Sequence, residues 1–162
     1  MPRHIFKFAA GLIFAAALPA AAQENLCGGT GDNGQWIGGD AINSDITTAP
    51  DYLEQMALVL LRNEYVSLFT VSAGTEVRIE AAGRGNGDTI IDVRNETGEI
   101  ILSDDDSGGM GASRGELFLD PGTYCVSMSS YDGSPLTGFV RVGRMEHEPL
   151  TQGFTSEPMT GG

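Results

Sequence analysis

The feature that most constrains the fold is a series of short apolar and polar alternations separated by turn residues, densest between Asp88 and Tyr131. Successive residues of a β-strand point to opposite faces of a sheet, so alternation over about 4–8 residues is typical of a strand with one buried face. In the segment TEVRIEA, for example, we expect Val77 and Ile79 to point inward and the charged residues around them to point outward. The pattern therefore predicts strands.

Turn signals separate these segments, among them Ser72-Ala73-Gly74, Glu96-Thr97-Gly98 and Asp120-Pro121-Gly122. The expected strands cover residues 65–71, 75–81, 89–93, 99–102, 115–120, 123–131 and 137–145. Short strands at this spacing, without a long helical pattern, are typical of an all-β fold. We predict an antiparallel β-sandwich of jelly-roll type with an irregular N-terminal arm.

Residues 51–62 fit two secondary structures. Asp51 and Glu54 resemble a helix-capping pair, which favours a helix. Met56 to Leu61 form a continuous apolar run with no polar face, which fits a buried strand. We favour the strand because the segments that follow all have strand patterns.

The N-terminus has the pattern of a secretory signal peptide. Three basic side chains precede an apolar stretch from Phe8 to Leu18, and small residues follow up to Ala22. The apolar stretch is shorter than the ~20 residues that a membrane-spanning helix needs. We expect cleavage after Ala22, export to the periplasm or the extracellular space, and no transmembrane segment in the mature chain.

The chain after residue 22 is expected to form one domain with two appendages. A glycine-rich arm covers residues 23–50, the sandwich residues 51–145, and a flexible tail residues 146–162. The two cysteines, Cys27 and Cys125, form an even pair in an exported chain, and such a pair is normally oxidised. We therefore predict a disulfide that pins the arm to the sandwich.

The sequence is strongly acidic, with a formal net charge of −13 at pH 7. Loss of the signal peptide leaves seven arginines, no lysine and 22 acidic residues, a net charge near −15. Like-charge repulsion argues against nucleic acid and anionic membrane surfaces as partners. A cation or a basic partner is the natural complement, although the acidity also serves simple solubility.

Four segments taken together resemble the bacterial pre-peptidase C-terminal domain: YVSLFTVSAGTEVRIEA, DTIIDVRNETGEIILSDDDSGG, SRGELFLDPGTYCVSMSSY and FVRV. The order of these motifs carries the resemblance, which extends from about Met56 to Val142. It implies a jelly-roll sandwich of the kind usually appended to secreted bacterial hydrolases. Some members are related to calcium-dependent collagen-binding and carbohydrate-binding modules. This sequence differs in having no hydrolase and in placing a cysteine after the tyrosine of PGTY.

The acidic loop from Asp104 to Gly109 is the strongest candidate site. Asp104, Asp105 and Asp106 are consecutive, and Asp88 and Asp92 could contribute from the neighbouring hairpin. Calcium prefers six to eight oxygen ligands, so this group of carboxylates makes Ca²⁺ the candidate cofactor. The alternative is a solvated turn in which Asp and Ser side chains cap their own backbone and Arg114 pairs with one carboxylate.

Three aromatic residues are candidates for binding a ligand: Trp36 in the arm, Tyr124 in the PGTY segment, and Tyr131. Exposed aromatic rings often form the platforms of sugar-binding modules. Trp36 could instead pack against a sheet, and we favour that role for it.

The sequence gives little sign of catalysis. His147 is the only histidine after residue 22, and it lies in the expected tail. No serine has a histidine partner in a predicted element, and no two carboxylates are placed in contrasting environments. We therefore expect an exported, noncatalytic binding module for carbohydrate or for an envelope or secreted protein. The alternative is a structural or secretion-assisting accessory domain for a partner protein.

Overall fold

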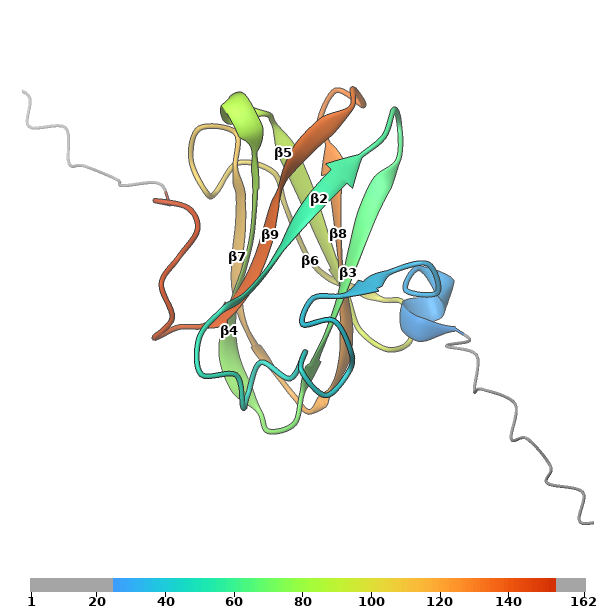
Figure 1. The fold of residues 1–162 in the computed structure, drawn as a ribbon, viewed down its shortest axis with the longest axis vertical. Helices are drawn as coiled ribbons and strands as arrows, with labels where there is room; N and C mark the ends of the chain where they lie inside the picture. The colour runs from blue at the N-terminus through green and yellow to red at the C-terminus, as the bar shows by residue number, and fades with distance from the viewer. Residues whose placement is uncertain (1–24, 154–162) are drawn as a thin grey trace, which may run out of the picture.

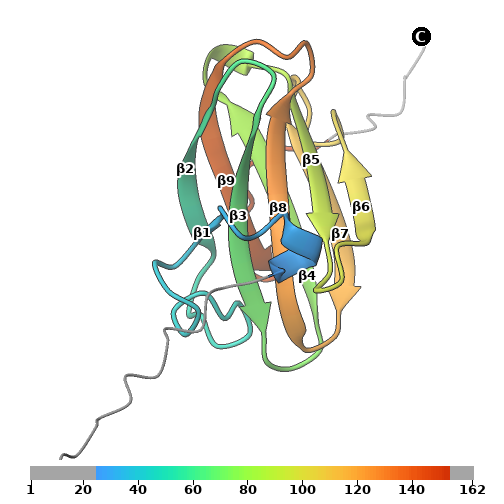
Figure 2. The ribbon, with the colours of Figure 1, turned by 90° about the vertical axis from the view of Figure 1, so that its right-hand side faces the viewer.

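Two β-sheets packed face to face form the structure, a computed structural model that describes residues 25–153 (Figure 1; Figure 2). The five-stranded sheet has the order β1 (Gln35–Trp36), β3 (Glu64–Val71), β8 (Gly122–Ser130), β5 (Thr89–Arg94) and β6 (Ile100–Asp104). The four-stranded sheet has the order β2 (Leu53–Val59), β9 (Leu136–Arg144), β4 (Thr75–Gly83) and β7 (Ser113–Leu119). The predicted all-β sandwich is confirmed.

Pairing is antiparallel throughout, except that β1 runs parallel to β3. Two short 3₁₀ segments, η1 (Leu26–Gly29) and η2 (Arg84–Asn86), are the only helical elements between residues 25 and 153. No helix in this part of the chain is long and apolar enough to cross a membrane. The predicted signal peptide lies outside the described residues.

The core lies between the sheets and follows the period of two. On β4, Val77, Ile79 and Ala81 are fully buried and face the other sheet, as the alternation predicts. On β8, Val126 and Met128 reach the same core. Each valine, isoleucine or methionine side chain among them contributes roughly 1.5–3 kcal/mol by leaving water, so the inward faces hold the two sheets together.

The segment at 51–62 is a strand, as favoured, but it is not a buried strand. β2 pairs only with β9 and forms an edge of its sheet. Ala57 and Val59 face the core, whereas Met56 and Leu58 on the other face are each 59% exposed. The continuous apolar run therefore supplies both faces of an edge strand, and only one of them is covered.

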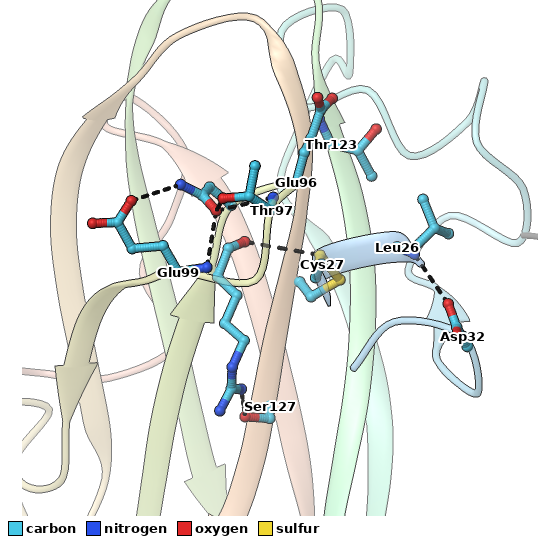
Figure 3. Close-up of a disulfide and its surroundings, with 11 residues drawn as sticks. Leu26, Cys27, Asp32, Glu96, Thr97, Glu99, Thr123 and Ser127 are labelled. Carbon is cyan, nitrogen blue, oxygen red and sulfur yellow. Dashed lines mark hydrogen bonds between the residues drawn. A yellow bond between two sulfur atoms is a disulfide. The ribbon is translucent and has the colours of Figure 1, made fainter. Parts of the chain in front are cut away.

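The N-terminal arm is fixed to the five-stranded sheet. Cys27 and Cys125 form a disulfide with an S–S distance of 2.05 Å, and both residues are buried (Figure 3). β1 continues this attachment along the free edge of β3. Trp36 is partly buried against the cluster that contains the two cysteines and Leu68, so it packs on the sheet.

The chain after Glu146 differs from the expected flexible tail. His147 and Thr151 are buried against the outer face of β4 and β9, and their contacts span about 70 residues of sequence. The tail expectation is therefore wrong for residues 146–153. Residues 154–162 lie outside the described part of the chain.

Replacing both cysteines with alanine should lower the free energy of unfolding by about 4–5 kcal/mol. The disulfide closes a loop with a sequence separation of 98 residues. A loop of that length restricts the unfolded chain by about this amount in the chain-entropy model. Urea unfolding of the wild type and the Cys27→Ala/Cys125→Ala variant measures the difference.

The wild type treated with a reductant under unfolding conditions is the control, because it removes the bond without changing packing. Equal unfolding free energies for all three samples would contradict a stabilising role for the disulfide.

Candidate functional site

Asp104 ends β6 and acts as the cap of the acidic loop. One carboxylate oxygen accepts hydrogen bonds from the backbone N–H groups of Ser107 (3.0 Å) and Arg114 (2.8 Å). The other accepts the hydroxyl of Ser107. Local bonds of this kind are typical of an aspartate that stabilises a turn. Asp104 thus joins the start of the loop to the first residues of β7.

The remaining aspartates do not gather around Asp104. Asp92 accepts a hydrogen bond from Ser103 (2.6 Å) and lies 3.9 Å from Arg94, while Asp105 and Asp106 are exposed. Asp88 is also exposed, and its carbonyl accepts the N–H of Tyr131.

Calcium does not fit this arrangement well. Between residues 25 and 153, no three carboxylate, histidine or cysteine side chains converge on a position that could hold a metal ion. The oxygens of Asp104 are already engaged with the turn. The guanidinium of Arg114 pairs with Glu116 (3.0 Å), and Glu116 lies outside the loop. The geometry thus favours a self-capped turn, in which Arg114 contributes its backbone N–H.

Tyr124 is a core residue, which corrects its assignment as an exposed ligand platform. It is 7% exposed, and its ring stacks on Phe69 with centroids 5.6 Å apart. Its hydroxyl donates to the carbonyl of Asp120, four residues upstream (2.7 Å). Burial, together with the charges of Asp120 and Glu96, raises the pKa of this hydroxyl. Tyr124 therefore fixes the turn between β7 and β8.

Tyr131 and Trp36 lie on different parts of the molecule. Tyr131 is 62% exposed and follows β8, near the start of β3. Trp36 is on β1, where it pairs with the middle of β3. The three aromatic residues do not form a common platform.

A pocket of about 210 Å³ opens at the end of the sandwich that carries the acidic loop. Three segments contribute its lining: the end of β4 and η2 (Ala82, Gly83, Asn86 and Gly87), the loop before β7 (Gly108, Gly109, Met110 and Ala112), and residues 150–153. In Figure 1 the red C-terminal segment runs beside the four-stranded sheet towards this end. The N–H of Gly153 donates to the carbonyl of Gly108 (3.0 Å), which joins two of the three walls.

Glycine allows the walls of the pocket to approach each other. A Cβ atom on Gly108 would lie 2.8 Å from the carbonyl oxygen of Ala112, and one on Gly87 would overlap the side chain of Leu136. Backbone groups therefore form much of the lining. The side chains of Asn86, Met110 and Gln152 are the largest polar or flexible groups that complete it.

Glu80 holds the third wall in place. It is 1% exposed on the outer face of β4, and its carboxylate accepts the N–H groups of Leu150 (2.8 Å) and Thr151 (3.0 Å). The hydroxyl of Thr151 donates to it as well (2.7 Å), and the Nε atom of Arg114 lies 3.9 Å away. A buried carboxylate needs such partners, because an unpaired buried charge costs several kcal/mol.

Two buried hydroxyls support the wall before β7. Ser113 donates to the carbonyl of Thr89 (2.8 Å), and the two side-chain oxygens lie 2.8 Å apart. The backbone N–H of Ser113 donates to the hydroxyl of Thr89 (3.1 Å). Ser113 thus serves to join β5 to β7, a structural role that the Ser-Arg pair in the sequence does not disclose.

His147 begins the segment that covers β4. Its Nδ1 atom accepts the backbone N–H of Arg144 (3.1 Å), so the ring proton of the neutral form lies on Nε2. That Nε2 atom is buried without a hydrogen-bond partner among the described residues. Burial and the positive charge of Arg144 outweigh Glu146 and Asp51 and lower the pKa of His147.

The sequence did not indicate that Thr151 would donate hydrogen bonds to the carboxylate of Glu80. The alternation correctly placed Glu80 on the outer face of β4, but it gave no sign that the face would be covered. Their contact joins residues 71 positions apart, so no local pattern could have indicated it.

No protein-family model and no curated protein matches this chain. Among solved structures, the pre-peptidase C-terminal domain of a collagenase from Bacillus anthracis is similar: it is 14% identical, covers 57% of this chain and 89% of that chain, and has a TM-score of 0.49. The Yersinia pseudotuberculosis-derived mitogen is 10% identical and covers 65% of this chain and 96% of that chain, with a TM-score of 0.46. PliG of Aeromonas hydrophila, a periplasmic inhibitor of g-type lysozyme, is 15% identical. The match covers 59% of this chain and 87% of that chain, with a TM-score of 0.44.

Replacing Asp104 with alanine should lower the free energy of unfolding by about 1–3 kcal/mol, because three donors lose a charged acceptor. Asp106→Ala is the matched control, since this carboxylate is exposed and has no hydrogen bond among the described residues. Its unfolding free energy should stay within about 0.5 kcal/mol of the wild type. Urea unfolding of the three proteins provides the measurement.

The same unfolding curves in millimolar calcium and in chelator separate the two interpretations of the acidic loop. A self-capped turn predicts equal midpoints. A midpoint that rises with calcium in the wild type and not in Asp106→Ala would support the calcium interpretation instead.

The stability of the protein should fall as the pH is lowered from 7.5 to 5.5. The unfolded histidine titrates near its ordinary pKa of about 6.5, whereas the pKa of folded His147 is lower, so the unfolded state binds more protons in this window. A His147→Asn variant keeps an acceptor for the N–H of Arg144 but does not titrate. Its urea midpoint should change less with pH than that of the wild type, and equal pH dependence would contradict the assignment to His147.

Proposed function

We propose that this protein is an exported, noncatalytic binding module that takes a neutral polar ligand in the pocket at the acidic-loop end of the sandwich. Carbohydrate is the first ligand class to consider, and an extended segment of an envelope protein is the second. The described chain is a small disulfide-linked β-sandwich, a form typical of oxidising compartments, which supports export.

The observation that carries the proposal is the neutrality of the pocket. The protein has 22 acidic residues, yet none of the residues that line the pocket is ionisable. Backbone amides, the side-chain amides of Asn86 and Gln152, and the methionine side chain of Met110 surround the space instead. Amide groups donate and accept hydrogen bonds together, which suits the hydroxyl groups of a sugar or the backbone of a peptide.

The same lining supports a noncatalytic role. A hydrolase would need a general acid, a base or a nucleophile within reach of the bound ligand. Asp104 lies nearby but caps its own loop, and Glu80 lies beneath Leu150 and Thr151. The pocket of about 210 Å³ is smaller than the ~300–1,000 Å³ of sites for drug-sized ligands, so its size suits one sugar ring or a short peptide segment.

A structural accessory role for a partner protein is the second candidate function. The exposed apolar face of β2 favours it, because exposed patches of this kind commonly mark protein interfaces.

Asn86→Gly and Gln152→Ala should each weaken ligand binding about tenfold, the loss expected for roughly one hydrogen bond. Glycine suits position 86, where φ is +57°, so the backbone is kept while the amide is removed. Gln35→Ala on β1 is the control, because it removes an exposed amide far from the pocket. The measurement is binding to an array of neutral oligosaccharides, followed by titration calorimetry with the best ligand.

Ligands that bind the wild type and all three variants equally would contradict the assignment to this pocket. If no neutral oligosaccharide binds the wild type, the carbohydrate form of the proposal fails.

A further inference from the structure

A second, more open hollow adjoins the pocket at the acidic-loop end of the sandwich. Its volume is about 490 Å³, and its lining consists of Ser107, Arg114, Glu116, Gln152 and Gly153. Gln152 and Gly153 also line the pocket, so the two spaces meet along this part of the C-terminal segment. We call the second space the Arg114 hollow.

Glycine forms the border between the pocket and the Arg114 hollow. The N–H of Gly153 donates to the carbonyl of Gly108 (3.0 Å), and a Cβ atom on Gly109 would lie 3.3 Å from the carbonyl oxygen of Gly153. A Cβ atom on Gly153 itself would lie 2.7 Å from Nη1 of Arg114. None of the three glycines places a side chain between the two spaces, so a ligand can extend from one into the other.

The carboxylate of Glu116 is held in the Arg114 hollow by one of its two oxygens. Its Oε1 atom accepts hydrogen bonds from Nε of Arg78 (3.1 Å) and from Nε (3.2 Å) and Nη2 (3.0 Å) of Arg114. Its Oε2 atom has no hydrogen bond within the described chain, and the side chain is 42% exposed. Glu116 therefore offers a fixed acceptor to a ligand.

Arg114 supplies donors beside that acceptor. A guanidinium has five N–H groups, and contacts within the described chain use three of them: two reach Glu116, and Nη1 donates to the carbonyl of Thr151 (3.5 Å). Arg114 and Glu116 also cancel each other's formal charge. The Arg114 hollow thus resembles the pocket in suiting a neutral ligand, but it binds through charged groups instead of amides.

We infer that the pocket and the Arg114 hollow form one groove for a linear neutral oligosaccharide, with one sugar unit in the pocket and the next unit over Arg114 and Glu116. This inference rests on the proposed function and specifies its ligand class. Neighbouring sugar hydroxyls each donate and accept, so two of them match a carboxylate and a guanidinium that lie side by side. Hydrogen bonds to charged groups are stronger than those between neutral groups, so the second unit should add affinity.

The first test measures how affinity depends on ligand length. The probes are glucose, mannose, galactose and N-acetylglucosamine, each as the monosaccharide, a linear dimer and a linear trimer, titrated into the wild type by calorimetry. For at least one of these sugars we expect the dimer to bind about tenfold more tightly than the monosaccharide, since the second unit gains roughly one hydrogen bond to a charged group. The trimer should add little more, because the two spaces hold two units.

The second test assigns the gain to the Arg114 hollow. Glu116→Gln removes the charge of the acceptor and should weaken binding of the dimer about tenfold while leaving the monosaccharide unchanged. Asn86→Gly alters only the pocket and should weaken both ligands. Glu54→Gln is the matched control, because Glu54 also pairs with an arginine, Arg141 (2.6 Å), but lines neither space. It should leave both affinities unchanged.

A third measurement needs no variant and so does not depend on the stability of Glu116→Gln. In nuclear magnetic resonance spectra of the wild type, the saturating monosaccharide should shift the amide signals of Asn86 and Met110. The dimer should also shift the amide signal of Ser107 and the Nε–H signal of Arg114, because these groups lie at the Arg114 hollow.

Dimers that bind no more tightly than monosaccharides would overturn the groove and leave the proposed function of the pocket intact. The same holds if Glu116→Gln and Glu54→Gln weaken the dimer equally, or if the dimer leaves the signals of Ser107 and Arg114 unshifted. If none of the sugars binds the wild type, the groove and the carbohydrate form of the proposed function fail together.

Discussion

The buried carboxylate of Glu80 is the interaction on which the candidate site depends. Glu80 lies on the outer face of β4, where solvent would normally surround it, yet it is 1% exposed. The N–H groups of Leu150 and Thr151 and the hydroxyl of Thr151 replace the lost water. Because a buried charge is costly without such partners, the covering segment is held in one position. That position supplies the third wall of the pocket.

The outer face of the four-stranded sheet is divided between two environments. Over β4, Arg78 and Glu80 bind the backbone of the C-terminal segment: the guanidinium of Arg78 donates to the carbonyl of His147 (3.1 Å). Over β2, apolar side chains face outward and no segment of the described chain covers them. Charged residues on a strand can recruit polar backbone from elsewhere in the chain, whereas an apolar face needs an apolar partner. The β4 half of this face therefore suits a contact within the chain, and the β2 half suits a contact with another molecule.

The edge strands of the sandwich also differ in whether another segment covers them. The arm protects β3 through β1 and through the bridge between Asp45 and Thr70, and the disulfide secures its start. Arg144 holds the far end of the arm by donating to the carbonyls of Ile46, Thr47 and Ala49. No comparable segment of the described chain lies along β2. The arm therefore contributes to stability along β3, whereas no such segment covers β2.

The sequence by itself determined the strands from β3 to β9, the turns between them and the two ends of the disulfide. These depend on alternation with a period of two, on local turn chemistry and on the even number of cysteines in an exported chain. For Asp104 to Gly109 it left two interpretations open, a calcium site and a turn capped by its own side chains, and the bond from Ser107 to Asp104, only three residues away, favours the turn. Only the tertiary structure decided that Tyr124 is buried, that one face of β2 is open, and that residues 150–153 complete a pocket. The physical reason is distance along the chain: burial and coverage depend on which remote segments meet, as Glu80 and Thr151 do across 71 positions of sequence.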